Sequence, residues 1–463
     1  MTSGQKIWFI SEVYHPDEQG TAFYTTGLAE GLAEHFPVGV LCDRPTVTAR
    51  GIRVRRKERR NGVLIQRCGG TTFDKNVFVL RLINMLTFTG AILVRALITV
   101  KKGDIVIAVT SPPSAPFIAR LVCAVRQAGC ILRIEDVYPE TLVATGMIGQ
   151  GSLVNRLLGF LDRLLYRSVD HIVVLGRDME ALVKKKTGGP GKNVRVIRCW
   201  ADTDVVFPTP RESNALLQEL GLQTKFVVSC AGNMGRAQAM ESVLEAAALL
   251  RTDETVHFLF IGSGTKKDWI EREIDRRGMK NVTLTGQLPR ADQINFLNAC
   301  DISIIPLLPG MTGAGVPSRV YNIMAAGKPI IAVTGEGSEV SLLVRDEGIG
   351  WAVAPSAGPE GIVQAIVDGR SDHKRLRKMG YKAHCLARER YSREGVVKEY
   401  LELLGEMMPG RKPERADERI WREQKGKRGS EFIAPEAPLI AERTMTAKTL
   451  PLGRGRAPGE KKC

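Results

Sequence analysis

Residues 312–329 read Thr-Gly-Ala-Gly-Val-Pro-Ser-Arg-Val-Tyr-Asn-Ile-Met-Ala-Ala-Gly-Lys-Pro, and an apolar run follows them directly. The glycines predict a turn that runs into a helix, which Gly327 and the proline after it bring to an end. The apolar run is typical of a buried parallel strand. The first N–H groups of such a helix favour phosphate, and Arg319 adds charge-assisted hydrogen bonds. The stretch therefore predicts an α/β fold with an anion site at Pro317, Ser318 and Arg319.

Two earlier turns have the same character. Phe226–Cys230 predicts a strand that runs into Ala231-Gly-Asn-Met-Gly-Arg236, and Phe258–Ile261 predicts another that ends in Gly-Ser-Gly264. Glycine and asparagine let the backbone approach a ligand closely at such turns. Together the three turns indicate one nucleotide site. The candidate donor-binding residues in the first two turns are Gly232, Asn233, Gly235, Arg236, Gly262 and Gly264.

The rest of the chain alternates strand and helix signals, which predicts doubly wound parallel sheets. A chain of 463 residues is too long for one core and suits two domains and an appendage. We expect an amino-terminal domain at 1–200, a linker at 201–210 and a carboxy-terminal domain at 211–387. Ligands bind beyond the carboxyl ends of the strands in such sheets, so the active site is expected between the domains.

Six motifs add a resemblance to a known family. They are Tyr14-His-Pro-Asp-Glu-Gln-Gly20, Ser111-Pro-Pro113, Glu135-Asp-Val-Tyr-Pro-Glu140, Ala231-Gly-Asn-Met-Gly235, Phe260-Ile-Gly-Ser-Gly264, and Pro317-Ser-Arg-Val-Tyr321 through Gly327-Lys-Pro329. In their order and spacing, residues 5–405 resemble the retaining nucleotide-sugar glycosyltransferases of family 4. That resemblance implies the GT-B fold, two Rossmann-like domains facing a cleft. The subgroup it resembles builds bacterial surface polysaccharides such as O-antigen, colanic acid and capsule.

The resemblance also implies where the substrates bind. The donor nucleotide would lie on the carboxy-terminal domain and the acceptor on the amino-terminal one. Arg319, Ser318 and Arg236 would hold the diphosphate and neutralise the charge on the leaving nucleotide. Gly20 would let the first loop approach the phosphates. A late helix at 388–408 would cross back to the amino-terminal domain.

Four carboxylates are further candidates for the site. Asp136 and Glu135 follow a predicted strand and face the expected cleft, so we assign them, with Arg319, to catalysis. A turn cap is the alternative for Asp136. Glu336 and Glu339 follow another predicted strand and could bind donor hydroxyl groups, but a solvated face or a helix cap remains open for both.

The chain also departs from the family pattern. Many members have glutamates where Ala314 and Asn322 stand here, and a phosphate-facing lysine near Gln238. These departures keep open a GT-B scaffold that binds ligands without catalysis. His15 lies in the first loop, where an aromatic residue commonly stands in the family, so we predict a packing role for it.

No metal site is expected, because the sequence has no Asp-x-Asp pair near a strand end and no cluster of histidine and cysteine. The resemblance agrees, since GT-B enzymes generally work without a divalent ion. We therefore expect no cofactor, with a nucleoside-diphosphate sugar as the co-substrate. The nucleoside, UDP or GDP, and the sugar remain open.

The net charge of +16 indicates an anionic partner. Basic residues crowd 44–67, most densely at 53–60, and recur in the tail after Arg411. The stretch 77–100 is apolar but interrupted by Arg81 and Arg95. No nucleic-acid recognition motif accompanies them, so an anionic membrane surface is the better candidate and nucleic acid is not expected. The stretch 77–100 is expected to be an interfacial helix beside the acceptor site, with an ordinary buried helix as the alternative.

Nine isolated cysteines and no signal peptide before the first predicted strand favour a reducing, cytoplasmic location. The tail 409–463 is basic, lacks apolar periodicity and is expected to be disordered. The predicted protein is a peripheral enzyme at the cytoplasmic face of the inner membrane. It would transfer a sugar to a saccharide or polyprenyl-diphosphate-saccharide acceptor. A soluble transferase with a small acceptor is the alternative among enzymes.

Overall fold

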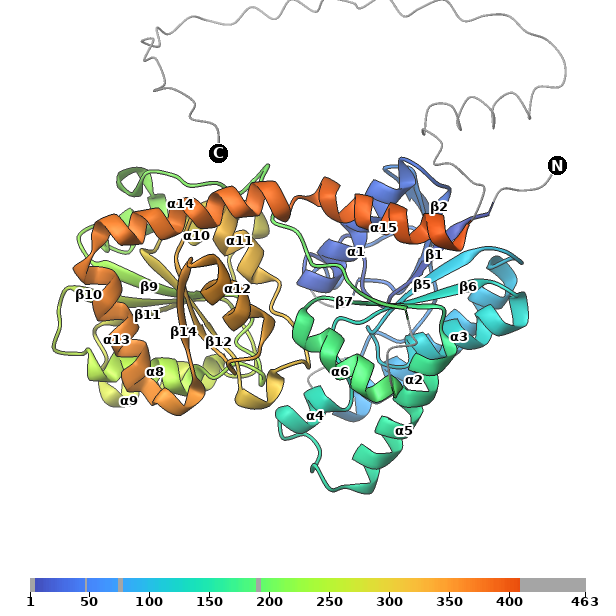
Figure 1. The fold of residues 1–463 in the computed structure, drawn as a ribbon, viewed down its shortest axis with the longest axis horizontal. Helices are drawn as coiled ribbons and strands as arrows, with labels where there is room; N and C mark the ends of the chain where they lie inside the picture. Colours follow the sequence, from blue (N-terminus) through green and yellow to red (C-terminus); the bar gives the residue numbers. More distant parts are fainter. Residues whose placement is uncertain (1–4, 46–47, 74–77, 189–192, 409–463) are drawn as a thin grey trace, which may run out of the picture.

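The computed structural model describes residues 5–45, 48–73, 78–188 and 193–408. They form two lobes that lie side by side, each with a parallel sheet between layers of helices (Figure 1). The first lobe contains β1–β8, and the second contains β9–β14. This arrangement confirms the expected architecture of two doubly wound domains. We retain the boundaries 1–200, 201–210 and 211–387 as a proposal that the two sheets support.

The first lobe has an eight-stranded sheet in the order β3-β4-β2-β1-β5-β6-β7-β8. Its strands are β1 Ile7–Ile10, β2 Val38–Cys42, β3 Lys57–Arg60, β4 Val63–Arg67, β5 Ile105–Val109, β6 Gly129–Arg133, β7 His171–Val174 and β8 Asn193–Val196. Its helices are α1 Gly20–Ala33, α2 Phe78–Thr99, α3 Ala115–Arg126, α4 Glu140–Ala144, α5 Leu153–Ser168 and α6 Arg177–Thr187. In the central register Phe9 pairs with Val40 on one side and Ile107 on the other, and all three side chains are buried.

The second lobe has a six-stranded parallel sheet in the order β11-β10-β9-β12-β13-β14. Its strands are β9 Phe226–Ala231, β10 Val256–Ile261, β11 Val282–Thr285, β12 Ile302–Pro306, β13 Ile330–Val333 and β14 Gly350–Val353. Its helices are α7 Ala215–Glu219, α8 Met240–Leu249, α9 Lys267–Arg277, α10 Gln293–Asn298, α11 Arg319–Ala325, α12 Glu339–Glu347, α13 Gly358–Ser371 and α14 His373–Arg390, with single turns η1 Arg211–Ser213, η2 Arg290–Asp292, η3 Pro309–Met311 and η4 Pro355–Ala357.

Two elements differ from the sequence expectation. Strand β3 pairs antiparallel with β4 at the edge of the first sheet, and its charged sequence Lys-Glu-Arg-Arg carries no apolar signal. The helix expected at 388–408 is the end of α14 followed by α15, Arg393–Met407. The break is at Ser392, whose side chain accepts a hydrogen bond from the Gly395 N–H and so caps α15.

The last helix joins the lobes. α15 packs against α1 of the first lobe, and Figure 1 shows it lying above the sheet that contains β1. The Arg393 guanidinium donates to the Gly27 carbonyl oxygen at 2.9 Å. Close packing supports the contact, because a Cβ on Gly31 would lie 2.5 Å from Val397. The segments that follow β1 and β6 are thereby held against the loop 312–318 of the second lobe, where Gly20 approaches Ser318 and Asp136 pairs with Gly315. The tail 409–463 lies outside the described residues.

Candidate active site

The first two glycine turns of the second lobe are in direct contact. The Gly232 N–H, after β9, donates to the Ile261 carbonyl oxygen at 2.8 Å, and the Met234 N–H donates to Ser263 at the same distance. Gly232 and Gly262 have φ values of 127° and 141°, which glycine alone adopts readily. The structure thus brings these two predicted turns together into one surface at the carboxyl end of the sheet.

This contact leaves no room for a side chain at Gly262. A Cβ there would lie 2.0 Å from the Gly232 carbonyl oxygen. We expect Gly262→Ala to lower the free energy of unfolding by about 2 kcal/mol and to weaken nucleotide binding, because strain and collision combine. Gly278→Ala is a matched control, since Gly278 also has positive φ but faces open space. Denaturant unfolding measures both, and equal losses would contradict the collision.

Arg319 lies over these turns. It is the first residue of α11, and its guanidinium donates to the Ala231 carbonyl oxygen at 3.2 Å and to the Gln238 side chain. Its Nε is buried without a hydrogen-bond partner, and burial lowers the pKa of Arg319. Within the described part of the chain no carboxylate pairs with it. Arg319 is half-buried and has no counter-ion there, which is costly for a cation, so this position favours a bound anion.

The neighbouring basic residues have different surroundings. Arg236 is exposed and forms no ion pair within residues 193–408. Lys266 was not predicted from the sequence, and it lies beside the turns with its Nζ 2.7 Å from both the Gln238 carbonyl oxygen and Glu241. The feature of the sequence that could have indicated Lys266 is its position two residues after Gly264. The Gln238 side chain accepts a hydrogen bond from Arg319 and so helps to hold the guanidinium in place.

The loop of the third turn meets the first lobe at Asp136. The Val137 N–H donates to the Ala314 carbonyl oxygen at 2.8 Å, and Asp136 forms an isolated bridge with Gly315. A Cβ on Gly315 would lie 2.8 Å from the Asp136 Oδ1. Burial, and then the neighbouring Glu135, raise the pKa of Asp136 to about 6. This carboxyl group is thus placed at the junction of the lobes and titrates near neutrality.

Glu135 has a structural contact that the sequence did not reveal. Its carboxylate lies 2.7 Å from the Nε of Arg133, a buried residue on β6. The pair neutralises a guanidinium inside the first lobe. Its assignment to catalysis remains a prediction, and Asp136 is the carboxylate of the two that faces the other lobe.

This pair leads to a stability prediction. Glu135→Gln should lower the free energy of unfolding by about 2 kcal/mol, because Arg133 would remain buried without its counter-ion. Glu336→Gln is the control, since Glu336 is exposed. Chemical denaturation of both variants checks the difference. A loss of turnover with full stability would instead favour the catalytic role of Glu135.

Glu339 joins the lobes through two arginines of the first lobe. It is 1% exposed, and its carboxylate accepts hydrogen bonds at 2.9 Å from both Arg177 and Arg198. Sequence reasoning missed both arginines, which are distant from Glu339 along the chain. Glu336 has no such contact with any residue that the structure describes. Binding of donor hydroxyl groups by Glu336 and Glu339 therefore remains a prediction.

The other predicted residues lie around the same junction. Gly20 begins α1, and a Cβ there would lie 3.4 Å from the Ser318 Oγ. The Tyr24 hydroxyl donates to the Ser318 carbonyl oxygen at 3.4 Å. A Cβ on Gly264 would lie 2.6 Å from the Asn233 Oδ1. The residues that the structure gathers here are Gly20, Gly232, Asn233, Gly235, Gly262, Gly264, Pro317, Ser318, Arg319 and Asp136.

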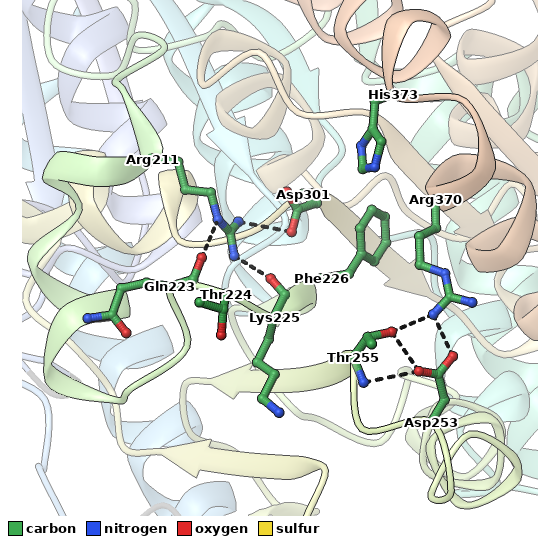
Figure 2. Close-up of a pocket in the computed structure, with 10 residues that line it drawn as sticks. All are labelled: Arg211, Gln223, Thr224, Lys225, Phe226, Asp253, Thr255, Asp301, Arg370 and His373. Atoms are coloured by element: carbon green, nitrogen blue, oxygen red, sulfur yellow. Dashed lines mark hydrogen bonds and ion pairs between the residues drawn. The ribbon is translucent and has the colours of Figure 1, made fainter.

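Two cavities lie elsewhere. One of about 350 Å³ lies between the lobes, with His15, Trp200 and Arg290 in its lining. The other, of about 650 Å³, is shown in Figure 2 at the amino ends of the second-lobe strands. Its Arg211 and Arg370 are already paired with Asp301 and Asp253. Neither cavity includes the glycine turns, so we do not place the donor in them.

Metal ligands do not gather at the junction. In the part of the chain that the structure describes, no group of three or more histidine, cysteine, aspartate or glutamate side chains could hold an ion. The groups that the described residues bring to the candidate site are the backbone of the glycine turns, the guanidinium of Arg319 and the carboxyl group of Asp136.

Comparisons with known families agree with this geometry. Residues 19–200 match the glycosyl transferase 4-like domain, and residues 225–372 match the glycosyl transferases group 1 domain. The chain is 36% identical over 256 residues to a Pseudomonas aeruginosa protein named as the glycosyltransferase WbjE. That match covers 55% of this chain and 64% of WbjE, less than two thirds of that relative. The chain is also 26% identical over 288 residues to an Escherichia coli K12 protein named as the colanic acid biosynthesis glycosyl transferase WcaI, covering 61% of this chain and 69% of that protein.

Solved structures share the fold. Sucrose-phosphate synthase from Thermosynechococcus elongatus matches with a TM-score of 0.71 and 15% identity, over 88% of this chain and all of that one. Anabaena HepE, solved with UDP and glucose, matches with a TM-score of 0.67 and 15% identity, over 87% of this chain and all of HepE. At these identities the likeness concerns the fold alone, and it confirms the GT-B fold expected from the sequence.

Proposed function

We propose that this chain, which belongs to the family 4 glycosyltransferases by its 4-like and group 1 domains, transfers a sugar from a nucleoside diphosphate to a saccharide or lipid-linked saccharide. The product would be part of a bacterial surface polysaccharide, which the colanic acid biosynthesis named for WcaI supports. The proposal includes retention of the anomeric configuration and no requirement for a divalent ion, as the resemblance implies.

The observation that carries the proposal is the unpaired guanidinium of Arg319 above the glycine turns. A diphosphate there would supply the missing counter-ion, and the exposed backbone at Gly232 would let it approach closely. As the donor bond breaks, negative charge develops on the leaving nucleotide, and a cation already in place stabilises that charge. The complexes of HepE with UDP and UDP-glucose support a donor of this class.

The first lobe would hold the acceptor. Asp136 lies opposite the loop 312–318, where its carboxylate can accept a hydrogen bond from an acceptor hydroxyl or orient the donor sugar. A lipid-linked acceptor would place the enzyme at the cytoplasmic face of the inner membrane. The GT-B fold itself requires no membrane, so this location is a separate part of the proposal.

A screen of nucleotides and nucleotide sugars tests the proposal. Purified full-length protein would be heated with UDP, GDP and their sugars, because a bound ligand raises the apparent melting temperature. We expect one nucleoside series to stabilise the protein and its sugar to be slowly hydrolysed. Binding without hydrolysis or transfer would favour an inactive scaffold. Transfer to a short water-soluble saccharide at full rate would favour the small-acceptor alternative, and no response to any nucleotide would contradict the proposal.

A further inference from the structure

One side of the first lobe presents large apolar side chains to solvent. They lie on α2, α3 and α5, which pack beside one another on the face of the sheet opposite α1 and α15 (Figure 1). We call this surface the α2–α3–α5 face. Its exposed apolar residues are Val79, Leu82, Ile83, Leu86, Val94 and Ile98 on α2, Leu121 and Val125 on α3, and Leu153, Val154, Leu157, Phe160 and Leu164 on α5. Such a surface marks an interaction site.

The orientation of α5 explains its part in this face. Asp162 points inward and is 7% exposed, while Phe160 is 51% exposed. The inward side is fixed by Lys186, whose Nζ lies 2.7 Å from Glu140 and 3.4 Å from Asp162. Because the polar network lies under the helix, the apolar stripe has to face outward. The exposure of Phe160 is therefore built into the lobe.

Helix α2 lies on the lobe and is part of its core. Residues 82–99 are long and apolar enough to cross a membrane by length and composition alone, with a mean hydropathy of 1.7. Yet Phe88, Ile92 and Ala96 are fully buried within the first lobe. Pulling α2 into a spanning position would expose that core. The helix is thus suited to lie along a membrane surface.

The charges of the face select its partner. Helices α2 and α3 contain no acidic residue, and the single acidic residue of α5, Asp162, is buried. Exposed basic residues border the apolar stripe, at Arg95, Arg126, Arg156 and Arg163. A second copy that docked through the same face would bring these cations together without a carboxylate between them. An anionic lipid surface offers both the apolar layer and the negative charge.

We propose that the α2–α3–α5 face docks on an anionic lipid bilayer, with α5 lying in the headgroup layer. The sequence had directed attention to the basic stretch 53–60, but β3 is at one end of the sheet, whereas α5 packs against α6, which contacts β8 at the other end. This inference rests on the proposed function, since it names the surface from which a lipid-linked acceptor would enter. Helix α4, between Asp136 and α5 in the chain, contacts η3 of the second lobe.

Cosedimentation with phosphatidylglycerol and phosphatidylcholine vesicles tests this. We expect the full chain to bind the anionic vesicles at least about tenfold more strongly at low salt than the neutral ones. The double variant Leu157→Ser with Phe160→Ser should lose at least about tenfold of that affinity. Its matched control is Leu249→Ser with Phe207→Ser, another exposed leucine–phenylalanine pair, at 52% and 45%, away from this face.

A second pair of variants separates the two basic regions. Arg156→Gln with Arg163→Gln should weaken binding more than Arg55→Gln with Arg56→Gln, which changes exposed residues next to β3. The inference would be overturned if the wild-type protein stayed in the supernatant with anionic vesicles. It would also be overturned if the two apolar double variants, or the two arginine double variants, lost equal vesicle affinity. Dimerisation that disappears in the Leu157→Ser, Phe160→Ser protein would also overturn it. Thermal shifts of the same proteins with nucleotide report binding at the donor site. Failure of the proposed function can therefore be distinguished from failure of the membrane proposal.

Discussion

Arg319→Ala is expected to lose about 2–4 kcal/mol of transition-state stabilisation, which is about 30-fold to 900-fold in turnover. The reason is that Arg319 is a guanidinium over the glycine turns whose Nε is buried without a hydrogen-bond partner. Steady-state release of nucleoside diphosphate measures the loss, and the thermal shift with nucleotide should shrink in parallel. Arg236→Ala is the control, because exposed Arg236 should contribute about tenfold or less.

The stability of the nucleotide-free protein provides an independent check. Burying a charge without a counter-ion costs folding free energy, so Arg319→Met should melt no lower than the wild type while losing its nucleotide response. A large loss of stability would show that the bonds to Ala231 and Gln238 hold the turn together. Unchanged turnover together with unchanged nucleotide affinity would remove Arg319 from the site.

Asp136→Asn is expected to lower turnover by about 10²–10⁴-fold and to leave nucleotide affinity nearly intact. Asp136 belongs to the first lobe and contacts the loop 312–318 of the second. The first two glycine turns, where the nucleotide is proposed to bind, lie in the second lobe. Asparagine keeps the size of the side chain and removes only the charge. The split between turnover and binding is the readout that a merely structural role would not produce.

The pH dependence of Asp136 gives a second readout. Its pKa is raised from 3.8 to about 6, so we expect turnover to rise with pH through a midpoint near 6. The folded protein disfavours the ionised form, so this group stabilises the fold fully below about pH 4, and that contribution is lost as the pH rises through about 6. Asp136→Asn should flatten both profiles between these values. A profile unchanged by the substitution would exclude Asp136 as the titrating group, and an unfolded variant would favour a capping role.

The sequence predicted the elements whose signals are local. Apolar runs followed by glycines placed β9 and β10, and the apolar run after Pro329 placed β13. A buried parallel strand and a turn with positive φ each require particular residues at adjacent positions. The three turns and Arg319 followed from the same logic. Strand β3 was missed because one face of this edge strand is exposed and the other only half-buried, so it needs no apolar side chains.

Other features depend on residues that are distant in the sequence. The contacts of Glu339 with Arg177 and Arg198, and of Asp136 with Gly315, cross between the lobes. No periodicity encodes which side chains meet across such a junction, because the docking of the lobes decides it. The same holds for Lys266, which reaches Gln238 only when the first two turns pack together.

By itself, the sequence determined two α/β lobes, the glycine turns and a cationic residue at the third turn. Only the tertiary structure decided which faces are buried. The pattern of α5 shows that the helix has one apolar side and one polar side, and the usual expectation would turn the apolar side inward. Lys186 instead draws Asp162 into the lobe, and Leu157 and Phe160 remain in solvent. The physical reason is that the periodicity of the sequence defines which residues share a side of the helix. Which of the two sides is buried depends on the residues that pack against the helix in the folded protein.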